Sequence, residues 1–152
     1  IYNDYVVNTT VTFHIKPLTM DEMRTLVFHP DPRHATFVII LDGAVIGYVG
    51  LSAHHLREAY RDTADIAVYI KKENRGAGIG EAAVRFIEKY AKERGFRALI
   101  AAISGENTRS IALFRRLGYF QCAHYRKVGE KFGRLLDVID FEKLIGEDAV
   151  NE

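Results

Sequence analysis

Hydrophobic positions along this chain recur with a helical period in some segments and with a strand-like pattern in others. The most regular helical pattern lies in residues 82–95, and Gly95 ends it. The apolar positions that we expect to face the core are Ala82, Ala83, Phe86, Ile87, Tyr90 and Ala91. A shorter helix is predicted after Asn107, a residue type that caps helix N-termini, and Gly118 ends it.

Short apolar and β-branched runs predict strands elsewhere. Residues 35–53 hold two such runs on either side of Asp42 and Gly43, a pair typical of a two-residue hairpin turn. Further strand-like segments cover residues 63–70, 97–103, 119–128 and 134–141. Strands with interspersed helices indicate an α/β (α+β) fold around a mixed sheet. We expect one domain that covers residues 1–152.

The first residues already carry a helical pattern. Ile1, Tyr2, Tyr5 and Val6 have helical spacing, and the sequence does not begin with Met. We therefore expect the chain to start within a helix, with an upstream segment before it.

Composition and charge narrow the class of protein. Hydrophobic residues make up 48% and charged residues 27%, which argues against disorder, and a net charge of +1 provides no field for nucleic acid or anionic membranes. The sequence carries no apolar run as long as a membrane span and no signal-peptide pattern. A single cysteine, Cys122, is typical of a reducing compartment, so we expect a cytoplasmic protein. Its surroundings suggest a half-buried strand residue rather than a nucleophile.

A glycine-rich loop at residues 75–80, Arg-Gly-Ala-Gly-Ile-Gly, joins a predicted strand to the long helix. Backbone N–H groups at a helix N-terminus can bind an anion there, and glycines permit close approach. A P-loop is excluded because Glu81 follows Gly80, and the dinucleotide fingerprint is excluded because no third glycine stands at its offset. On the loop alone, an anion site and a plain tight connection both remain open.

Two segments together resemble a known superfamily. Arg75-x-x-Gly78-x-Gly80 is similar to the pyrophosphate loop of the GNAT N-acetyltransferases, and residues 105–119, GENTRSIALFRRLGY, resemble their second signature. The resemblance extends to the branch of phosphinothricin and L-amino-acid N-acetyltransferases. The segments that carry it are IYNDYVVNTTVTF, REAYRDTADIAVYI and VGEKFGRLLDV, at residues 1–13, 57–70 and 128–138.

The resemblance implies a fold and a donor. It predicts a mostly antiparallel sheet whose strands splay at an acetyl-CoA site, and a chain that lacks the family's first strand and part of its first helix. It assigns the pantetheine arm to the backbone of Val68, Tyr69 and Ile70, whose N–H groups are also candidates for an oxyanion hole. The residues it assigns to the diphosphate are Arg75, Gly76, Ala77, Gly78, Ile79 and Gly80. Asn107 and Ser110 match positions that contact the lower part of CoA.

Amide formation from an ammonium requires a proton acceptor. The family's proposed base is a Glu on the strand before the loop, and Asp65 occupies that position, one methylene shorter. The alternative is a local hydrogen bond at a strand edge. Direct transfer in a ternary complex is expected because no nucleophile is well placed for a covalent intermediate. Phe114 stands where many members carry a Tyr general acid, so that role does not transfer.

The acceptor site is less defined. Arg57, Tyr60 and Arg61 match the branch's substrate wall, where an Arg fork would suit a carboxylate, although a solvated polar loop explains them equally well. Three residues near the C-terminus differ from those frequent in phosphinothricin-type enzymes. Leu135 stands where Trp is frequent, and Phe132 and Leu136 stand where His is frequent. These differences argue against phosphinothricin as the substrate. Adjacent His54 and His55 are not expected to form a metal site, because neighbouring side chains point apart and no further ligands cluster with them.

Three functions follow as hypotheses. The first is acetyl transfer to the α-amine of a small amino acid or analogue. The second is acetylation of a protein N-terminus or lysine, and the third is a non-catalytic acyl-CoA sensor. No metal is expected, and the resemblance implies a homodimer.

Overall fold

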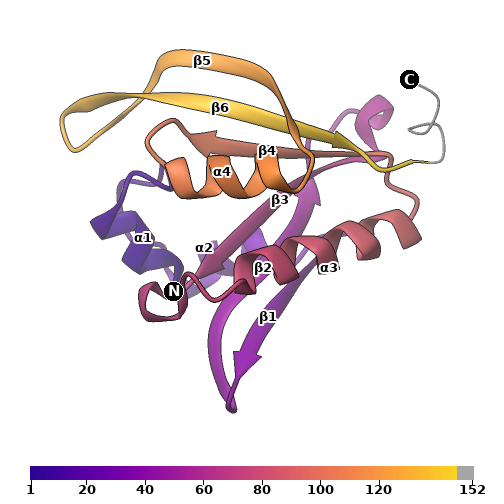
Figure 1. Ribbon diagram of the computed structural model, residues 1–152, viewed down its shortest axis with the longest axis horizontal. Coiled ribbons are helices and arrows are strands. Elements are labelled where there is room, and N and C mark those ends of the chain that lie inside the picture. Colours follow the sequence, from indigo (N-terminus) through magenta and orange to yellow (C-terminus); the bar gives the residue numbers. More distant parts are fainter. Residues whose placement is uncertain (147–152) are drawn as a thin grey trace.

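The computed structural model of the protein describes residues 1–146, so the last six residues of the expected domain lie outside the described part. Six strands form one mixed sheet with helices on both faces (Figure 1). The helices are α1 (Tyr2–Asn8), α2 (Met20–Val27), α3 (Ile79–Glu93) and α4 (Thr108–Arg116), with short 3-10 turns η1 (Glu58–Tyr60) and η2 (Lys72–Asn74). The strands are β1 (Ala35–Leu41), β2 (Ala44–Ala53), β3 (Thr63–Ile70), β4 (Ala98–Ser104), β5 (Phe120–Lys131) and β6 (Arg134–Leu144). The α/β prediction is therefore confirmed.

The predicted hairpin is present between β1 and β2. Leu41 pairs with Ala44, and the two residues between them, Asp42 and Gly43, both have positive φ, at 50° and 78°. Two consecutive positive φ values define a turn whose twist matches that of the flanking strands. The dipeptide therefore specified the turn locally.

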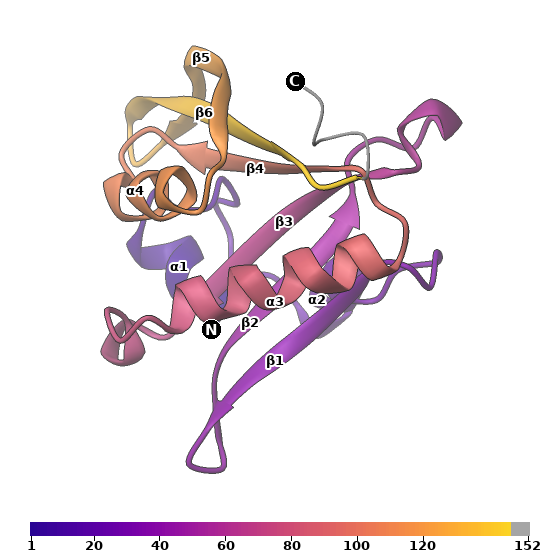
Figure 2. The same ribbon diagram turned by 45° about the vertical axis from the view of Figure 1, so that its right-hand side comes forward.

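The sheet has the order β1-β2-β3-β4-β6-β5, and only the central pair β3 and β4 is parallel. That pairing is short: Thr63 pairs with Ala98, Ala64 with Leu99, and Asp65 with Ile100. Beyond Asp65 the two strands separate, as both views show (Figures 1 and 2). The expected splay is thus present, and we call the opening between the two strands the fork.

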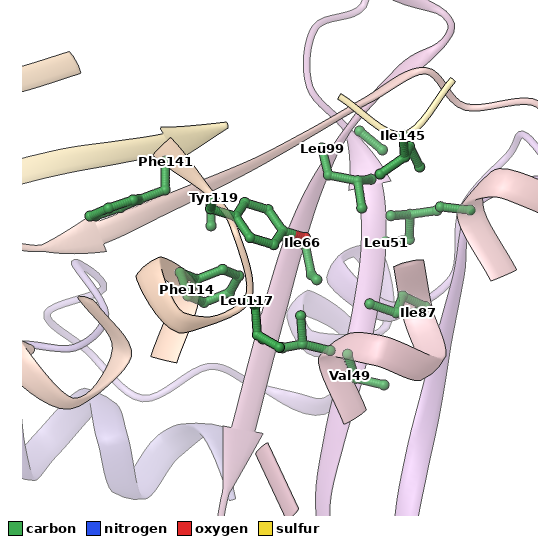
Figure 3. Close-up of a cluster of buried hydrophobic side chains, with 14 of the residues drawn as sticks. Val49, Leu51, Ile66, Ile87, Leu99, Phe114, Leu117, Tyr119, Phe141 and Ile145 are labelled. Atoms are coloured by element: carbon green, nitrogen blue, oxygen red, sulfur yellow. The ribbon is translucent and has the colours of Figure 1, made fainter. Parts of the chain in front are cut away.

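The main core lies between α3, α4 and one face of the sheet. Figure 3 shows part of this core. Leu51, Ile66 and Leu99 of the strands belong to one buried cluster with Ile87 of α3 and Phe114 of α4. Burial of these side chains on folding provides most of the stabilisation, about 1.5–3 kcal/mol for each fully buried large apolar side chain.

The buried face of α3 is rotated slightly from the predicted one. Ala83, Val84, Ile87 and Ala91 are buried, whereas Ala82 is exposed and Phe86 is 49% exposed. Phe86 instead packs edge-on against Phe37 of β1 at 5.0 Å between ring centroids. Val84 was missed because the predicted stripe was centred one position too far around the helix.

The helix α2 was not predicted. It contributes no buried residue, so it leaves little hydrophobic pattern. Its N-terminus is a capping box, in which Thr19 accepts from the Glu22 backbone N–H while the Glu22 carboxylate accepts from Thr19. The Thr-x-x-Glu spacing was a usable signal.

Cys122 is exposed rather than half-buried as predicted. The β5–β6 register shifts between Gln121 and Ala123, which breaks the regular alternation of side chains at Cys122. Its thiol donates only a long hydrogen bond to the Asp140 carbonyl at 3.4 Å. Within residues 1–146, no helix has the length and apolar character needed to span a membrane.

Candidate active site

The fork forms a hollow in the middle of the sheet. On its β3 side it is lined by Ile66 to Tyr69, on its β4 side by Ala101 to Ile103, and α4 supplies Ser110 and Phe114. Asp65 is the last residue of β3 that pairs with β4, so its backbone lies at the closed end of the fork. A strand edge that opens next to a carboxylate is therefore the central feature of this site.

Backbone groups of β3 point alternately toward β2 and toward β4. The Asp62 carbonyl accepts from Arg97 just before β4, at 2.8 Å, whereas the Lys71 N–H donates to Ile46 in β2, at 2.8 Å. Asp62 therefore faces β4 and Lys71 faces β2. Counting along the strand from either residue, the even-numbered residues Val68 and Ile70 direct their backbone groups into the fork. The Tyr69 backbone is directed toward β2 instead.

The Ile70 backbone already has partners. The buried Tyr5 hydroxyl of α1 donates to the Ile70 carbonyl at 2.6 Å and accepts from the Ile70 N–H at 3.2 Å. The Nε of Arg75 also donates to that carbonyl, at 3.2 Å. Of the three residues assigned to the pantetheine arm, Val68 is thus the one whose backbone faces the open fork without such a partner.

The glycine loop has the conformation that its composition requires. Gly76 and Gly78 have φ values of 97° and 77°, which residues with a Cβ adopt only with strain. Gly78 is the N-cap of α3 and provides no side-chain cap, so the N–H groups of the first turn have no partner from it. Gly80 has an ordinary φ, and a Cβ there would contact Leu113 of α4 at 3.4 Å.

A groove of about 380 Å³ extends from this loop to the fork and shares Val11, Val68, Asn107 and Ser110 with it. Three arginines line the groove: Arg75, Arg109 and Arg116. The Arg75 guanidinium lies 4.7 Å above the Tyr5 ring, which together with its bond to Ile70 fixes its position.

One carboxylate, Glu81, lies in the same groove. It accepts from Arg85 at 3.0 Å and from Arg116 at 3.1 Å, and these hydrogen bonds hold the pKa of its carboxyl below the usual range. Its charge is therefore compensated by two arginines.

Asn107 and Ser110 contact each other at the start of α4. The Asn107 Oδ1 accepts from the Ser110 N–H at 3.2 Å, and its Nδ2 donates to the Ser110 Oγ at 2.9 Å. Asn107 is therefore the predicted helix cap, and both residues also line the fork.

Asp65 has one hydrogen-bonding partner within residues 1–146. Its Oδ1 lies 2.7 Å from Nδ1 of His54, and its side chain is 43% exposed. Burial raises the pKa of Asp65, and the hydrogen bond from His54 opposes that increase. A higher pKa makes the carboxylate a stronger proton acceptor.

The three predicted acceptor-site residues belong to the turn η1 and its two caps. Tyr60, in η1, lies beside His55 and His54, with ring centroids 4.8 Å and 6.0 Å apart. Arg61 is exposed, with its Nε 3.7 Å from Asp62, and Arg57 is exposed at the start of the turn. Of the three, only Tyr60 contacts the surroundings of Asp65.

The sequence reasoning missed His54 and Tyr5. The expectation that His54 and His55 point apart is wrong, because both residues lie where the chain leaves β2 and their ring centroids are 4.4 Å apart. Residues 1–146 nevertheless contain no group of three potential metal ligands. The only sequence signal at Tyr5 was its helical spacing, which says nothing of its partner. Its contact with Ile70 joins residues 65 positions apart.

Comparison with known proteins identifies this arrangement. The model of the acetyltransferase (GNAT) family matches residues 1–119. The L-methionine sulfoximine/L-methionine sulfone acetyltransferase of Pseudomonas aeruginosa is 33% identical over 141 residues, covering 91% of this chain and 81% of its own length. A phosphinothricin acetyltransferase from Sinorhizobium meliloti, solved with acetyl-CoA, superposes with a TM-score of 0.92 at 34% identity and covers 97% of this chain and 80% of its own.

A second solved structure, described as a ribosomal-protein-alanine N-acetyltransferase from Brucella melitensis, has a TM-score of 0.85 at 31% identity and covers 95% of this chain and 90% of its own. The relative and the two solved structures cover more than 90% of this chain, and the residues that the family model matches include the fork and the glycine loop. The chain therefore belongs to the GNAT family and is an acetyltransferase.

Proposed function

We propose that this acetyltransferase uses acetyl-CoA to acetylate the α-amine of a small amino acid or amino-acid analogue. The observation that carries the proposal is a continuous groove from an arginine-lined helix N-terminus to a free strand edge that opens beside a carboxylate. Its two ends suit two parts of acetyl-CoA, the diphosphate and, at the far end of the pantetheine arm, the thioester. The known activities of similar enzymes support the same choice of donor and acceptor class.

The diphosphate would bind at residues 75–80. The free N–H groups of the first turn of α3 carry the positive end of the helix dipole, and Arg75 and Arg109 add full charges. The positive φ values of Gly76 and Gly78 allow the loop to present its backbone, and no atom lies within 4 Å of the position of a Cβ at either glycine. Ala77 and Ile79 would contribute backbone groups only.

The pantetheine arm would lie in the fork and pair with the open edge of β3 at Val68, with the Asn107–Ser110 pair on its other side. The Val68 N–H is the favoured donor to the thioester oxygen, since the Ile70 N–H is bonded to Tyr5 and Tyr69 faces β2. A donor aimed at the developing oxyanion stabilises the transition state more than the ground state.

The transfer itself requires one proton acceptor. Asp65, directly or through a water, would take a proton from the substrate ammonium. The free amine nitrogen would then attack the thioester carbonyl, and the C–S bond would break as the tetrahedral intermediate collapses. The nitrogen would lose its second proton in this step, and the departing CoA thiolate would take it up to leave as the thiol. A thiol has a pKa of about 8.5, so a strong general acid is not required. Burial raises the pKa of Tyr69, which makes its hydroxyl a poor proton donor.

Arg57, Tyr60 and Arg61 remain the proposed acceptor wall, with Tyr60 favoured by its place beside His54. A protein N-terminal amine is the second candidate acceptor, favoured by the likeness to the ribosomal-protein-alanine enzyme. The homodimer also stays a prediction.

The test is release of free thiol from acetyl-CoA, measured with amino acids, methionine sulfoximine, phosphinothricin and N-terminal peptides. Higher kcat/KM with free amino acids or analogues supports the proposal. Release with peptides alone would replace it by the second candidate, and no release with any acceptor would contradict both.

A further inference from the structure

We propose that His54 is a positioning residue for Asp65: its Nδ1–H holds Oδ1, which leaves Oδ2 as the oxygen that receives the proton of the substrate amine. This inference rests on the proposed function. The contact that carries it is the 2.7 Å distance between Nδ1 and Oδ1. Within the described residues, the one side-chain hydrogen bond of Asp65 is made by Oδ1, which leaves Oδ2 without a protein partner.

The backbone explains why this contact forms. Ser52 of β2 pairs directly with Asp65 of β3, so their side chains share a face of the sheet. His54 lies two residues after Ser52 and therefore returns to that face. A diagonal neighbour at this separation is within reach of a long side chain. The contact thus joins two strands that pair from Gly47–Ile70 to Ala53–Ala64, alongside the fork.

Two neighbouring aromatic rings also pack against the imidazole. The rings of His55 and Tyr60 lie 4.4 Å and 6.0 Å from that of His54, and the His54 side chain is 26% exposed. A packed ring loses little further freedom when it forms a hydrogen bond, so the bond orients the carboxylate at low entropic cost.

The short side chain of Asp65 explains why its carboxylate needs a hydrogen-bonding partner that fixes its orientation. A carboxylate at the closed end of the fork, without a partner, could rotate both oxygens toward backbone donors. A misplacement of about 1 Å can cost about 100-fold in rate. Fixing Oδ1 distinguishes the two oxygens and reserves one for chemistry.

Three titratable groups act on Asp65, apart from its own burial: His54 and His55 after β2, and Asp140 of β6. The two histidines lower its pKa and Asp140 raises it. Loss of the His54 donor should therefore raise the pKa of Asp65, so that the acidic limb of the kcat/KM profile moves to higher pH.

The experiment compares His54→Asn with His54→Leu. An Asn amide can place a donor close to the position of Nδ1, whereas Leu fills similar space without a donor. We expect His54→Leu to lower kcat by about 10- to 100-fold with KM for acetyl-CoA nearly unchanged. In His54→Asn, kcat and the acidic limb should return most of the way to the original values. His54→Ala serves as a second donorless variant if the Leu variant does not fold.

The matched control is His55→Leu, which removes an imidazole that has no hydrogen bond to Asp65. It should move the acidic limb less than His54→Leu does. If His54→Asn is as impaired as His54→Leu, the imidazole itself is the proton acceptor, and the positioning role is overturned. Full activity in His54→Leu also overturns it.

A second readout needs no turnover. The pKa of the Asp65 carboxyl, followed by carbon-13 NMR, should be raised in His54→Leu and restored in His54→Asn. Equal values in all three proteins would contradict the positioning role even if acetyl transfer is confirmed. Absence of thiol release by the unmodified protein with every acceptor would instead contradict the proposed function.

Discussion

The substitution Tyr5→Phe tests how α1 completes the open edge of β3. The hydroxyl is the partner of both backbone groups of Ile70, and Tyr5 and Ile70 are only 7% and 8% exposed. Without the hydroxyl, the Ile70 carbonyl keeps the Arg75 Nε at 3.2 Å, but its N–H loses its partner. A buried donor left without a partner costs about 1–3 kcal/mol.

The assay is urea unfolding followed by circular dichroism. With a typical slope of about 2 kcal/mol per molar urea, the midpoint should fall by about 0.5–1.5 M at unchanged slope. The Phe ring keeps the surface on which the Arg75 guanidinium rests, so KM for acetyl-CoA should change by less than about threefold. Tyr5→Leu, which removes the ring, should raise KM as well.

A suitable control is Tyr2→Phe, because the Tyr2 hydroxyl bonds to Thr12 and His14 in a more exposed setting. It should lower the midpoint less. An unchanged midpoint in Tyr5→Phe would refute the view that this hydroxyl is the partner of the Ile70 N–H.

The remaining predictions concern the donor site and the base. Arg75→Lys loses the Nε hydrogen bond to Ile70 and the planar group that stacks on Tyr5. It should raise KM for acetyl-CoA by about tenfold and leave KM for acetyl-pantetheine, which has no diphosphate, unchanged. Equal effects on both donors would contradict the diphosphate role. Gly78→Ala should cost about 1–2 kcal/mol at its positive φ, measured by urea unfolding, and Gly80→Ala, with an ordinary φ, should cost less. Asp65→Asn should lower kcat by about 10²- to 10⁴-fold with little change in KM for acetyl-CoA; an unchanged kcat at all pH values would exclude Asp65 as the base. Because burial raises the pKa of Asp65, kcat/KM of the unmodified enzyme should decline on acidification at a pH above the usual aspartate pKa.

Much of the fold could be predicted from short sequence patterns. The hairpin turn at Asp42 and Gly43, the long helix ending at Gly95 and the cap at Asn107 depend only on residues a few positions apart. The helix α2 was the exception, because a helix that buries no side chain has no hydrophobic period to read. Its capping box was the only local sign.

The candidate site was predicted less completely. The glycine loop was found because its conformation depends on consecutive residues. The distinction among Val68, Tyr69 and Ile70 was not available, because all three belong to one apolar strand. They differ in which neighbour their backbone faces and in the bonds of Ile70 to the distant Tyr5. The same limit applies to Arg57 and Arg61, whose exposed side chains make no hydrogen bond or ion pair with Asp65 within the described residues.

The sequence by itself determined the local elements, the glycine loop and the family, because these depend on spacing within short segments. Only the tertiary structure decided where β3 and β4 separate, that Tyr5 completes the end of β3, and that His54 reaches Asp65. These contacts join residues from 11 to 65 positions apart, and their geometry depends on strand register and helix packing. A pairing of this kind leaves no period in the sequence, since either partner alone is consistent with many other neighbours.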